Sequence, residues 1–212
     1  MLIPFKDICE KYKIAPKGVI HVGAHHGEEI QDYYSNGVKH SVWIEANPSV
    51  FAVLEKTVAE YPKAFAVNAC LSDKVGEVTF NIANNSQSSS ILDLAYHKIA
   101  HPEVHYTETI SLQTTTLDEA MNVVKGKKLS FEFLNADIQG AEMLMLKGAP
   151  KTIEKLKYIY LEVSNKPIYE GCALIHEMDA FLAERGFTRV EVLWCGDFGW
   201  GDALYIKNTE IK

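Results

Sequence analysis

Short β-rich runs alternate with helical patterns along most of this 212-residue chain, and that alternation limits the fold more than any other sequence feature. The patterns predict strands at residues 18–24, 41–46, 63–72, 129–138 and 158–164. They predict helices at residues 27–37, 47–62, 141–156 and 173–186. Strands joined through helices need crossover connections, so the order predicts a mainly parallel sheet with helices on both faces.

The last two strand patterns, at residues 187–194 and 202–208, predict a different connection. Only "CGDFGWG" separates them, which is too short for a helical crossover, so they should form an antiparallel hairpin at one edge. The predicted fold class is therefore α/β, with a doubly wound, mainly parallel, seven-stranded Rossmann-like sheet and a C-terminal antiparallel hairpin. Two further alternating runs, 76–83 and 107–117, are expected to pair with each other on that sheet or beside it.

Charge and composition exclude several classes of protein. The net charge of −7 argues against a general affinity for nucleic acid. An acid and two lysines interrupt the N-terminal apolar residues, which is not the layout of a signal peptide, and no apolar run is long enough to cross a bilayer. The four scattered cysteines include no C-x-x-C pair. We therefore expect one cytoplasmic domain over residues 1–212, with free thiols and no membrane insertion.

A glycine loop and a strand-end acid suggest a nucleoside site. "VGAHHG" places Gly23 and Gly27 directly after the first strand, where glycines let the backbone turn sharply near a ligand. Glu45 ends the second strand, where such sheets place the acid that binds ribose hydroxyls. A ligand-free turn and a solvated acid are the structural alternatives. The spacing is not G-x-G-x-x-G, which favours adenosine without a pyrophosphate.

The order of these motifs resembles the FkbM-type S-adenosylmethionine (SAM)-dependent methyltransferases from about residue 18 to residue 187. The similar segments are "VIHVGAHHGE", "WIEANP", "NACLSDKVGEVTF", "SQSSSIL", "TTTLDEAM", "NADIQGAEMLMLKGA" and "YIYLEVS". The resemblance implies a class I methyltransferase fold, SAM as cofactor, and methyl transfer to a hydroxyl of a sugar, glycan or small natural product. It also implies a cofactor site at His21, Gly23, Ala24, His25, Gly27, Glu45, Ala46, Ala69, Cys70 and Asp137.

Three positions depart from the family pattern. His21 replaces the usual aspartate before the glycine loop, and His25 replaces an asparagine. Gln139 replaces the usual glutamate, which removes a charge beside the candidate active site. The change at His21 is expected to weaken or re-route contacts with the methionine end of SAM.

Asp137, at the end of a core strand, is the candidate base that removes the acceptor proton, and Glu162 is the second candidate. The alternatives for Asp137 are a contact with the SAM amino group or an N-cap of the next helix. Glu142 suits the positive end of that helix. A Mg²⁺ site at Asp137 and Glu162 is an open alternative, but our expectation is that no metal is used.

The acceptor site is expected in the variable segment 83–109, with Ser88, Ser89 and His105 as substrate-binding candidates. His25, His26 and His101 are further loop histidines that suit proton removal, although such residues are commonly just solvated. His101 and His105 have a helical zinc spacing, but Pro102 lies between them and the H-E-x-x-H pattern is absent. An N-terminal helical extension is expected at residues 1–17, and it or a sheet edge is a candidate surface for a homodimer.

Two alternatives to an active methyltransferase stay open at this point. The departures at His21 and Gln139 allow a SAM-binding module or partner subunit without turnover. A nucleotide-dependent oxidoreductase has a similar sheet, but the missing G-x-G-x-x-G motif and the predicted C-terminal hairpin argue against it.

Overall fold

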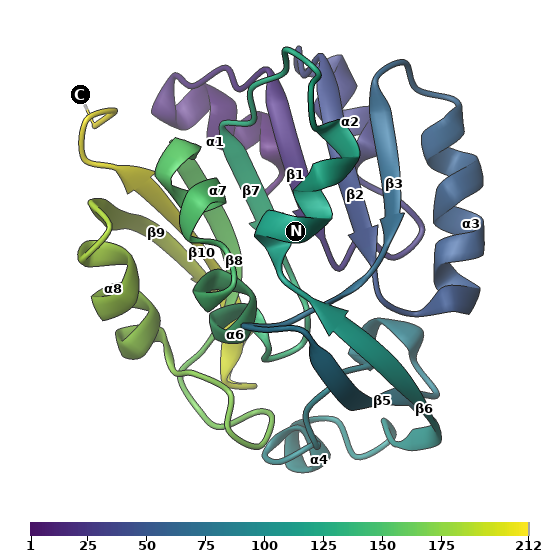
Figure 1. Ribbon diagram of the computed structural model, residues 1–212. Helices are drawn as coiled ribbons and strands as arrows, with labels where there is room; N and C mark the ends of the chain where they lie inside the picture. The colour runs from purple at the N-terminus through teal and green to yellow at the C-terminus, as the bar shows by residue number, and fades with distance from the viewer. Residues whose placement is uncertain (212) are drawn as a thin grey trace.

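The computed structural model describes residues 1–211, and its larger sheet has seven strands in the order β3-β2-β1-β7-β8-β10-β9 (Figure 1). Their bounds are β1 Gly18–Val22, β2 His40–Glu45, β3 Ala64–Asn68, β7 Phe133–Ala136, β8 Tyr158–Ser164, β9 Phe187–Trp194 and β10 Trp200–Lys207. The strands from β3 to β8 are parallel, whereas β10 runs antiparallel to β8 and β9. The predicted fold class is confirmed, including the C-terminal hairpin.

Helices cover both faces of this sheet. One face packs against α1 Phe5–Tyr12, α2 Ile30–Ser35 and α3 Pro48–Ala59. The other packs against α5 Leu117–Ala120, α6 Glu142–Lys147, α7 Pro150–Lys155 and α8 Ile175–Ala183. Coverage on both sides explains why every residue of β1, β2 and β8 is buried. Asn47 caps the N-terminus of α3, since its side chain accepts from Ser49 N at 3.0 Å.

The predicted helix at 141–156 is instead two helices, α6 and α7. Pro150 occupies the first turn of α7, where a backbone N–H would have no partner within the helix. Because proline has no N–H, it cannot donate the hydrogen bond that would continue α6 through this position. A side chain at Gly148 would also collide with the Ser72 carbonyl oxygen, because a Cβ there would lie 2.3 Å from that atom. The close approach of this turn to Ser72 therefore requires glycine at position 148, and Pro150 ends the helical hydrogen bonding that comes from α6.

The predicted strand at 63–72 also divides. Asn68 pairs with Glu45, the last residue of β2, so the residues that follow have no partner in the larger sheet. They form β4 Cys70–Leu71, which pairs with β6 Tyr106–Thr115. β6 in turn pairs antiparallel with β5 Gly76–Ala83, as the sequence predicts, and the three strands make a separate sheet.

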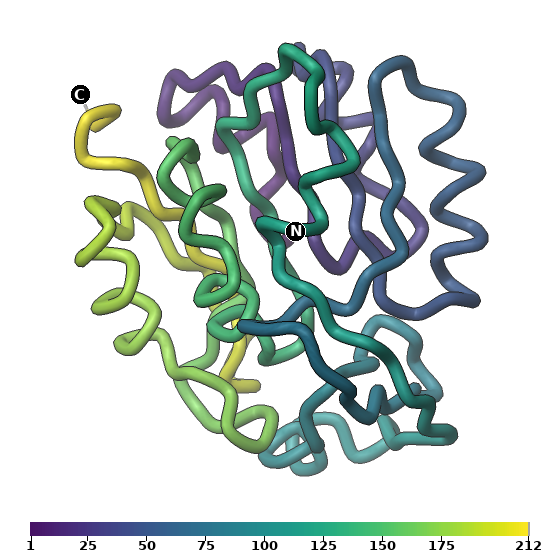
Figure 2. The backbone as a smooth tube through the Cα atoms, viewed as in Figure 1, coloured from purple at the N-terminus to yellow at the C-terminus, as the bar shows by residue number. Residues whose placement is uncertain are grey.

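The segment between β5 and β6 lies below the carboxyl ends of the parallel strands, as the teal part of the chain shows (Figure 2). It contains the short helices η1 Ser86–Ser88 and α4 His97–Ala100, and η2 Met121–Val124 follows α5. A bridge between Leu94 and Tyr169 ties the segment to the loop after β8. Among residues 1–211, no helix has the length and apolar character needed to cross a bilayer.

Candidate functional site

A cavity of about 420 Å³ lies at the carboxyl ends of β1, β2, β7 and β8 and is closed on one side by the segment between β5 and β6. It brings together twelve of the fourteen residues that the sequence proposes for a site: His21, Gly23, Ala24, His25, Glu45, Ala46, Ala69, Cys70, Ser88, Ser89, Asp137 and Glu162. Gly27 and His105 do not line it. Gly27 packs on α3, and His105 is exposed, bonding Glu103 and Asn84.

Gly23 makes the turn at the end of β1. Its φ is +73°, and a Cβ there would lie 1.7 Å from the Asp137 carbonyl oxygen, so only glycine fits. The Gly23 and Ala24 backbone N–H groups both donate to the Ile44 carbonyl oxygen at 3.0 Å. The turn thus holds the ends of β1, β2 and β7 together at the cavity wall.

Glu45 lies at the end of β2 with 9% of its surface exposed. Its Oε2 accepts from His25 N at 3.0 Å, and its Oε1 accepts from Asn47 N at 2.8 Å. Burial raises its pKa, and these backbone hydrogen bonds oppose the rise. A carboxylate has further lone pairs, so Glu45 retains acceptor capacity for hydroxyl groups of a ligand.

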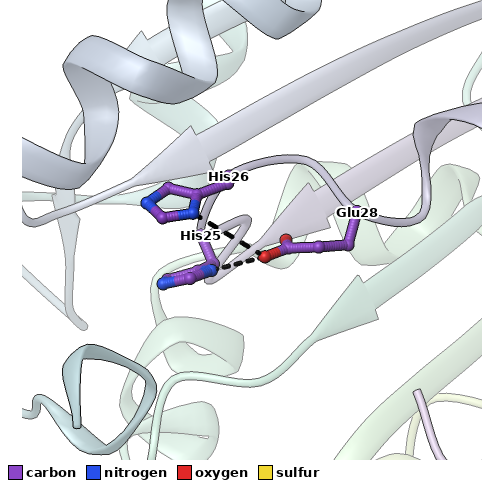
Figure 3. Close-up of side chains that lie close together, drawn as sticks. All are labelled: His25, His26 and Glu28. Atoms are coloured by element: carbon purple, nitrogen blue, oxygen red, sulfur yellow. Dashed lines mark hydrogen bonds and ion pairs between the residues drawn. The ribbon is translucent and has the colours of Figure 1, made fainter.

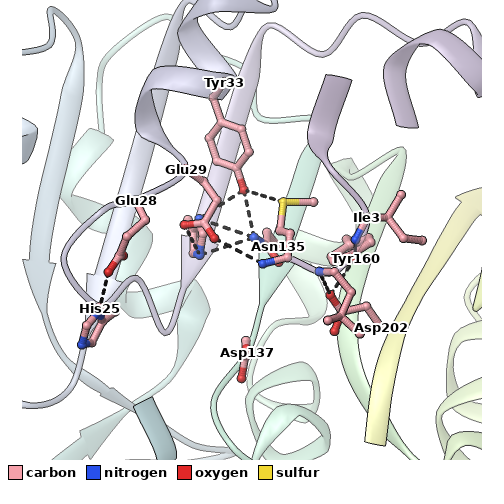
Figure 4. Close-up of polar contacts among 12 residues, drawn as sticks. Ile3, His25, Glu28, Glu29, Tyr33, Asn135, Asp137, Tyr160 and Asp202 are labelled. Atoms are coloured by element: carbon pink, nitrogen blue, oxygen red, sulfur yellow. Dashed lines mark hydrogen bonds and ion pairs between the residues drawn. The ribbon is translucent and has the colours of Figure 1, made fainter. Parts of the chain in front are cut away.

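The inner wall of the cavity carries a buried polar network around His21 (Figure 4). The Tyr33 hydroxyl lies 3.1 Å from His21 Nδ1, and Asn135 Nδ2 donates to that hydroxyl at 2.9 Å. Burial lowers the pKa of His21, so the imidazole is neutral at neutral pH. The nearest acid is Glu29, whose Oε2 lies 4.0 Å from His21 Nε2. Glu29 is thus the acid beside the position where the family pattern has an aspartate.

The first two residues, Met1 and Leu2, also line the cavity. The Met1 ammonium lies 3.2 Å from Glu29 Oε1, and Leu2 N donates to Asp202 Oδ2 at 2.7 Å. Asp202 also accepts from the Tyr160 hydroxyl at 2.6 Å. Burial raises the pKa of Asp202 to about 6, even though the bond from Tyr160 opposes the rise.

Three carboxyl groups meet at the opposite side of the Gly23 turn. One oxygen of each of Asp137, Glu142 and Glu162 lies within 4.8 Å of the others, a spacing that a cation would also tolerate. Gln139 Nε2 donates to Asp137 Oδ1 at 2.7 Å and to Glu162 Oε2 at 2.8 Å. Gln139 itself is in the left-handed region (φ +56°), a strained conformation that its side-chain contacts hold in place.

Burial affects the two candidate bases, Glu162 and Asp137, differently. Burial raises the pKa of Glu162 strongly, and the charges of Asp137 and Glu142 add to the rise. The neutral form of Glu162 is therefore favoured, and its carboxyl group is buried against Gln139, whereas Asp137 is exposed to the cavity. Asp137 does not cap the next helix, because α6 begins at Glu142 and its N-cap makes no side-chain bond.

The cluster of three carboxyl groups should make the free energy of unfolding depend on pH. Burial, followed by the charge of Asp137, raises the pKa of Glu142 from 4.5 to about 8. The protonated form stabilises the fold fully below the unfolded pKa, and that contribution is lost as pH rises through about 8. Urea unfolding should thus give a free energy lower by about 3 kcal/mol at pH 9 than at pH 6. Glu142→Gln should flatten this decline.

Glu55→Gln, at an exposed position of α3, is the matched control and should leave the decline unchanged. An equal decline in the wild type and in Glu142→Gln would contradict the assignment of the raised pKa to Glu142.

His25, His26 and Glu28 form a second group at the cavity rim (Figure 3). His25 Nδ1 lies 2.6 Å from Glu28 Oε1, and His25 Nε2 lies 2.9 Å from Ser86 Oγ. His26 is more exposed and does not line the cavity. The group links the glycine turn to η1, which carries the serine-rich stretch.

The serine-rich stretch uses its hydroxyls largely within the protein. Ser89 Oγ accepts from Ala83 N at 3.2 Å, and Ser90 Oγ donates to the Gln139 carbonyl oxygen at 2.8 Å. Ser88 is buried at the cavity wall. Much of the stretch therefore fixes the loop over the cavity, while Ser88 and Ser89 stay within reach of a ligand.

Sequence reasoning missed several cavity residues, among them Glu29, Asn135, Asp202 and His97. Asn135 gave a signal, since it is a polar residue inside an otherwise apolar strand. Asp202 gave none, because the register of β10 against β8 places it opposite Glu162, and no sequence pattern specifies that register.

Among the described residues, the lining of the cavity is mainly acidic, and its positive group is the Met1 ammonium, which contacts Glu29. Within the described residues, seven acidic side chains line it and no lysine or arginine does: Glu28, Glu29, Glu45, Glu103, Asp137, Glu162 and Asp202. Such a lining favours a ligand that carries positive charge and disfavours phosphate groups.

Comparison with known sequences gives a consistent result. A family model described as a methyltransferase FkbM domain matches residues 21–189. The chain is also similar to the 2-O-methyltransferase NoeI of Sinorhizobium fredii, with 24% identity over 162 residues. That match covers 72% of this chain and 65% of NoeI, so the chain spans less than two thirds of that relative.

Solved structures share the fold. Methyltransferase FkbM from Methylobacillus flagellatus has a TM-score of 0.57 and 14% identity, over 90% of this chain and 43% of that one. TrmK from M. capricolum, solved with S-adenosylhomocysteine, has a TM-score of 0.51 and 9% identity, over 98% and 70% of the two chains. At these identities the likeness concerns the fold alone.

Proposed function

Because this chain belongs to the FkbM methyltransferase family, whose model matches residues 21–189, we propose that it is a SAM-dependent O-methyltransferase. The acceptor we propose is a hydroxyl group of a sugar, a glycan or a small natural product. The similarity to NoeI, whose name describes 2-O-methyl transfer, supports oxygen as the methylated atom.

The acidic lining of the cavity carries this proposal. SAM brings an ammonium, a sulfonium and one carboxylate, a net positive charge, into a site with seven carboxyl groups and no lysine or arginine among the described lining residues. A dinucleotide would bring a pyrophosphate into the same site, where no basic side chain would offset its charge. The lining therefore supports SAM over the oxidoreductase alternative.

The residues present fit SAM at both ends of the cavity. Glu45, at the end of β2, would accept hydrogen bonds from the ribose hydroxyls, while its bonds to His25 N and Asn47 N keep it in place. Glu29 would bind the ammonium of the methionine part, next to the neutral His21. Glu29 then takes the role that the usual aspartate at position 21 would have.

SAM supplies a methyl group that is already activated by its bond to a positively charged sulfur. The protein must align the acceptor oxygen and remove its proton. We assign proton removal to Asp137 and the orientation of Asp137 to Gln139, whose amide holds Asp137 Oδ1 at 2.7 Å. Glu162, buried and bound to the same amide, holds Gln139 from the other side.

Calorimetry with two ligands tests the cofactor. SAM and S-adenosylhomocysteine are expected to bind with dissociation constants of about 1–100 μM, and NAD is expected to give no heat of binding. The physical reason is the charge of the lining, which attracts the ammonium and repels the pyrophosphate. Binding of NAD without binding of SAM would exclude a methyltransferase.

One observation favours a second candidate, a SAM-binding module without turnover. Gln139 hydrogen-bonds both Asp137 and Glu162, so one oxygen of each acid is already engaged. If these bonds hold Asp137 away from the acceptor, the protein would bind SAM and transfer no methyl group. Transfer of labelled methyl from SAM to a panel of sugars distinguishes the two candidates.

A further inference from the structure

The turn that follows β7 is built around a tyrosine from the loop after β8. Tyr169 is 1% exposed, and a Cβ at Gly140 would lie 3.0 Å from its Cβ and from its Cδ2. The Tyr169 ring therefore lies directly against the backbone of the turn. The bridge to Leu94 fixes this tyrosine between two loops. The fold thus presents the Tyr169 hydroxyl to the residue before Gly140, which is Gln139.

Hydrogen bonds hold Gln139 from three directions. Its Oε1 accepts from the Tyr169 hydroxyl, and its Nε2 donates to Asp137 Oδ1 at 2.7 Å and to Glu162 Oε2 at 2.8 Å. Its backbone carbonyl oxygen accepts from Ser90 Oγ at 2.8 Å. These bonds engage both polar atoms of the side chain and support the left-handed backbone of Gln139 at φ +56°.

The Tyr169 hydroxyl decides which way the Gln139 amide faces. An ionised carboxylate only accepts hydrogen bonds, so the amide nitrogen has to face Asp137 and the amide oxygen has to face away. Among residues 1–211, the donor to that oxygen is the Tyr169 hydroxyl. Burial, followed by the charge of Glu162, raises the pKa of Tyr169, so the hydroxyl keeps its proton and stays a donor. Without this hydroxyl, the amide oxygen would lack a partner and the side chain would lose its fixed direction.

We propose that Tyr169 is a positioning residue for methyl transfer, because its hydroxyl fixes the Gln139 amide that holds Asp137 Oδ1. Tyr169 does not line the cavity, so it acts through Gln139 rather than on SAM or on the acceptor. The inference rests on the proposed function, since it takes Asp137 as the base. It extends the machinery of that function to a buried side chain outside the cavity.

The kinetic test measures transfer of labelled methyl from SAM to the panel of sugars by Tyr169→Phe. We expect kcat to fall about tenfold, while the acceptor KM and the calorimetric affinity for SAM change by less than about twofold. The same substitution in a Gln139→Gly background should lower kcat no further, because the hydroxyl then has no amide to fix. Glycine is the replacement at position 139 because it accepts the positive φ found there.

A second measurement follows the amide itself and needs neither SAM nor turnover. Solvent exchange of the Gln139 side-chain amide protons, measured by NMR, should be about tenfold faster in Tyr169→Phe, because the amide no longer stays bound to the two acids. Tyr205→Phe is the matched control, since Tyr205 is also 1% exposed and its hydroxyl bonds Asp179 outside the cavity. The control should leave both kcat and the amide exchange unchanged.

An unchanged kcat in Tyr169→Phe would overturn the positioning role, and so would an equal loss of kcat in Tyr205→Phe. A loss of kcat with unchanged amide exchange, or a further loss in the Gln139→Gly background, would also overturn it, because Tyr169 would then act by another route. A wild type that binds SAM and transfers no methyl group would overturn the role and leave the cofactor proposal standing. Absence of SAM binding to the wild type would instead remove the proposed function itself.

Discussion

Asp137→Asn is expected to lower the rate of methyl transfer about 100-fold or more while the affinity for SAM changes little. Asparagine has the same shape and can still accept the bond from Gln139 Nε2, so the local structure should be kept. It cannot take up a proton, and removal of the acceptor proton is the role assigned to this residue. Single-turnover transfer of labelled methyl, together with calorimetry for SAM, measures the two quantities separately.

Glu162→Gln should have a much smaller effect on the rate. Burial raises the pKa of Glu162, which favours the neutral carboxyl group, and glutamine resembles that neutral form. Asp93→Asn, an exposed aspartate outside the cavity, is the matched control. A larger loss in Glu162→Gln than in Asp137→Asn would reverse the assignment of the base. Loss of SAM binding in Asp137→Asn would make Asp137 a cofactor ligand.

Those parts of the fold that depend on local pattern could be predicted from the sequence. Alternation of strands and helices predicted the parallel sheet, and the seven residues between the last two strand patterns predicted the hairpin, because a helix does not fit there. The break in the helix at 141–156 has a local signal, Pro150, which the helical periodicity outweighed in the prediction. The break in the strand at 63–72 is non-local, because that strand leaves the sheet where β2 ends at Glu45.

The candidate site also contains residues that could be predicted from the sequence and residues that could not. Glu45 and Asp137 end parallel strands, and the carboxyl ends of such strands meet at one edge, so sequence position alone brings them together. Asp202 lies on the antiparallel strand β10, and its place beside Glu162 depends on a register that no pattern encodes. His97 lies in the irregular segment between β5 and β6, and only the contacts with the Ile168 loop bring it to the cavity.

Glu29 lies in the loop before α2. Hydrophobic periodicity does not predict where a loop side chain points. The Glu29 carboxylate is found beside His21 because the glycine turn returns the chain to the end of β1. The departure at position 21 is thus accompanied by an acid eight residues later in the sequence and 4.0 Å away in space. A neutral imidazole in the wall and a carboxylate in the cavity thus lie together where the family pattern has an aspartate.

Glu29→Gln is therefore expected to weaken SAM binding about 10- to 100-fold, which corresponds to the loss of one charge-assisted hydrogen bond. Methylthioadenosine has the adenosine and the sulfur of SAM but lacks the amino-acid end. Its affinity should be the same for the wild type and for Glu29→Gln. Calorimetry with both ligands on both proteins therefore isolates the ammonium contact from any general damage to the site.

The Met1 ammonium already contacts Glu29 at 3.2 Å, which indicates that this carboxylate accommodates an ammonium of the kind SAM carries. A bound cofactor would replace that contact, and the bond between Leu2 N and Asp202 would have to adjust with it. Glu55→Gln, on the exposed side of α3, serves as the matched control and should leave both affinities unchanged. An equal loss of affinity for SAM and for methylthioadenosine in Glu29→Gln would show that Glu29 supports the cavity wall. The ammonium of SAM would then need a different acid, and Asp202 is the alternative on the same side of the cavity.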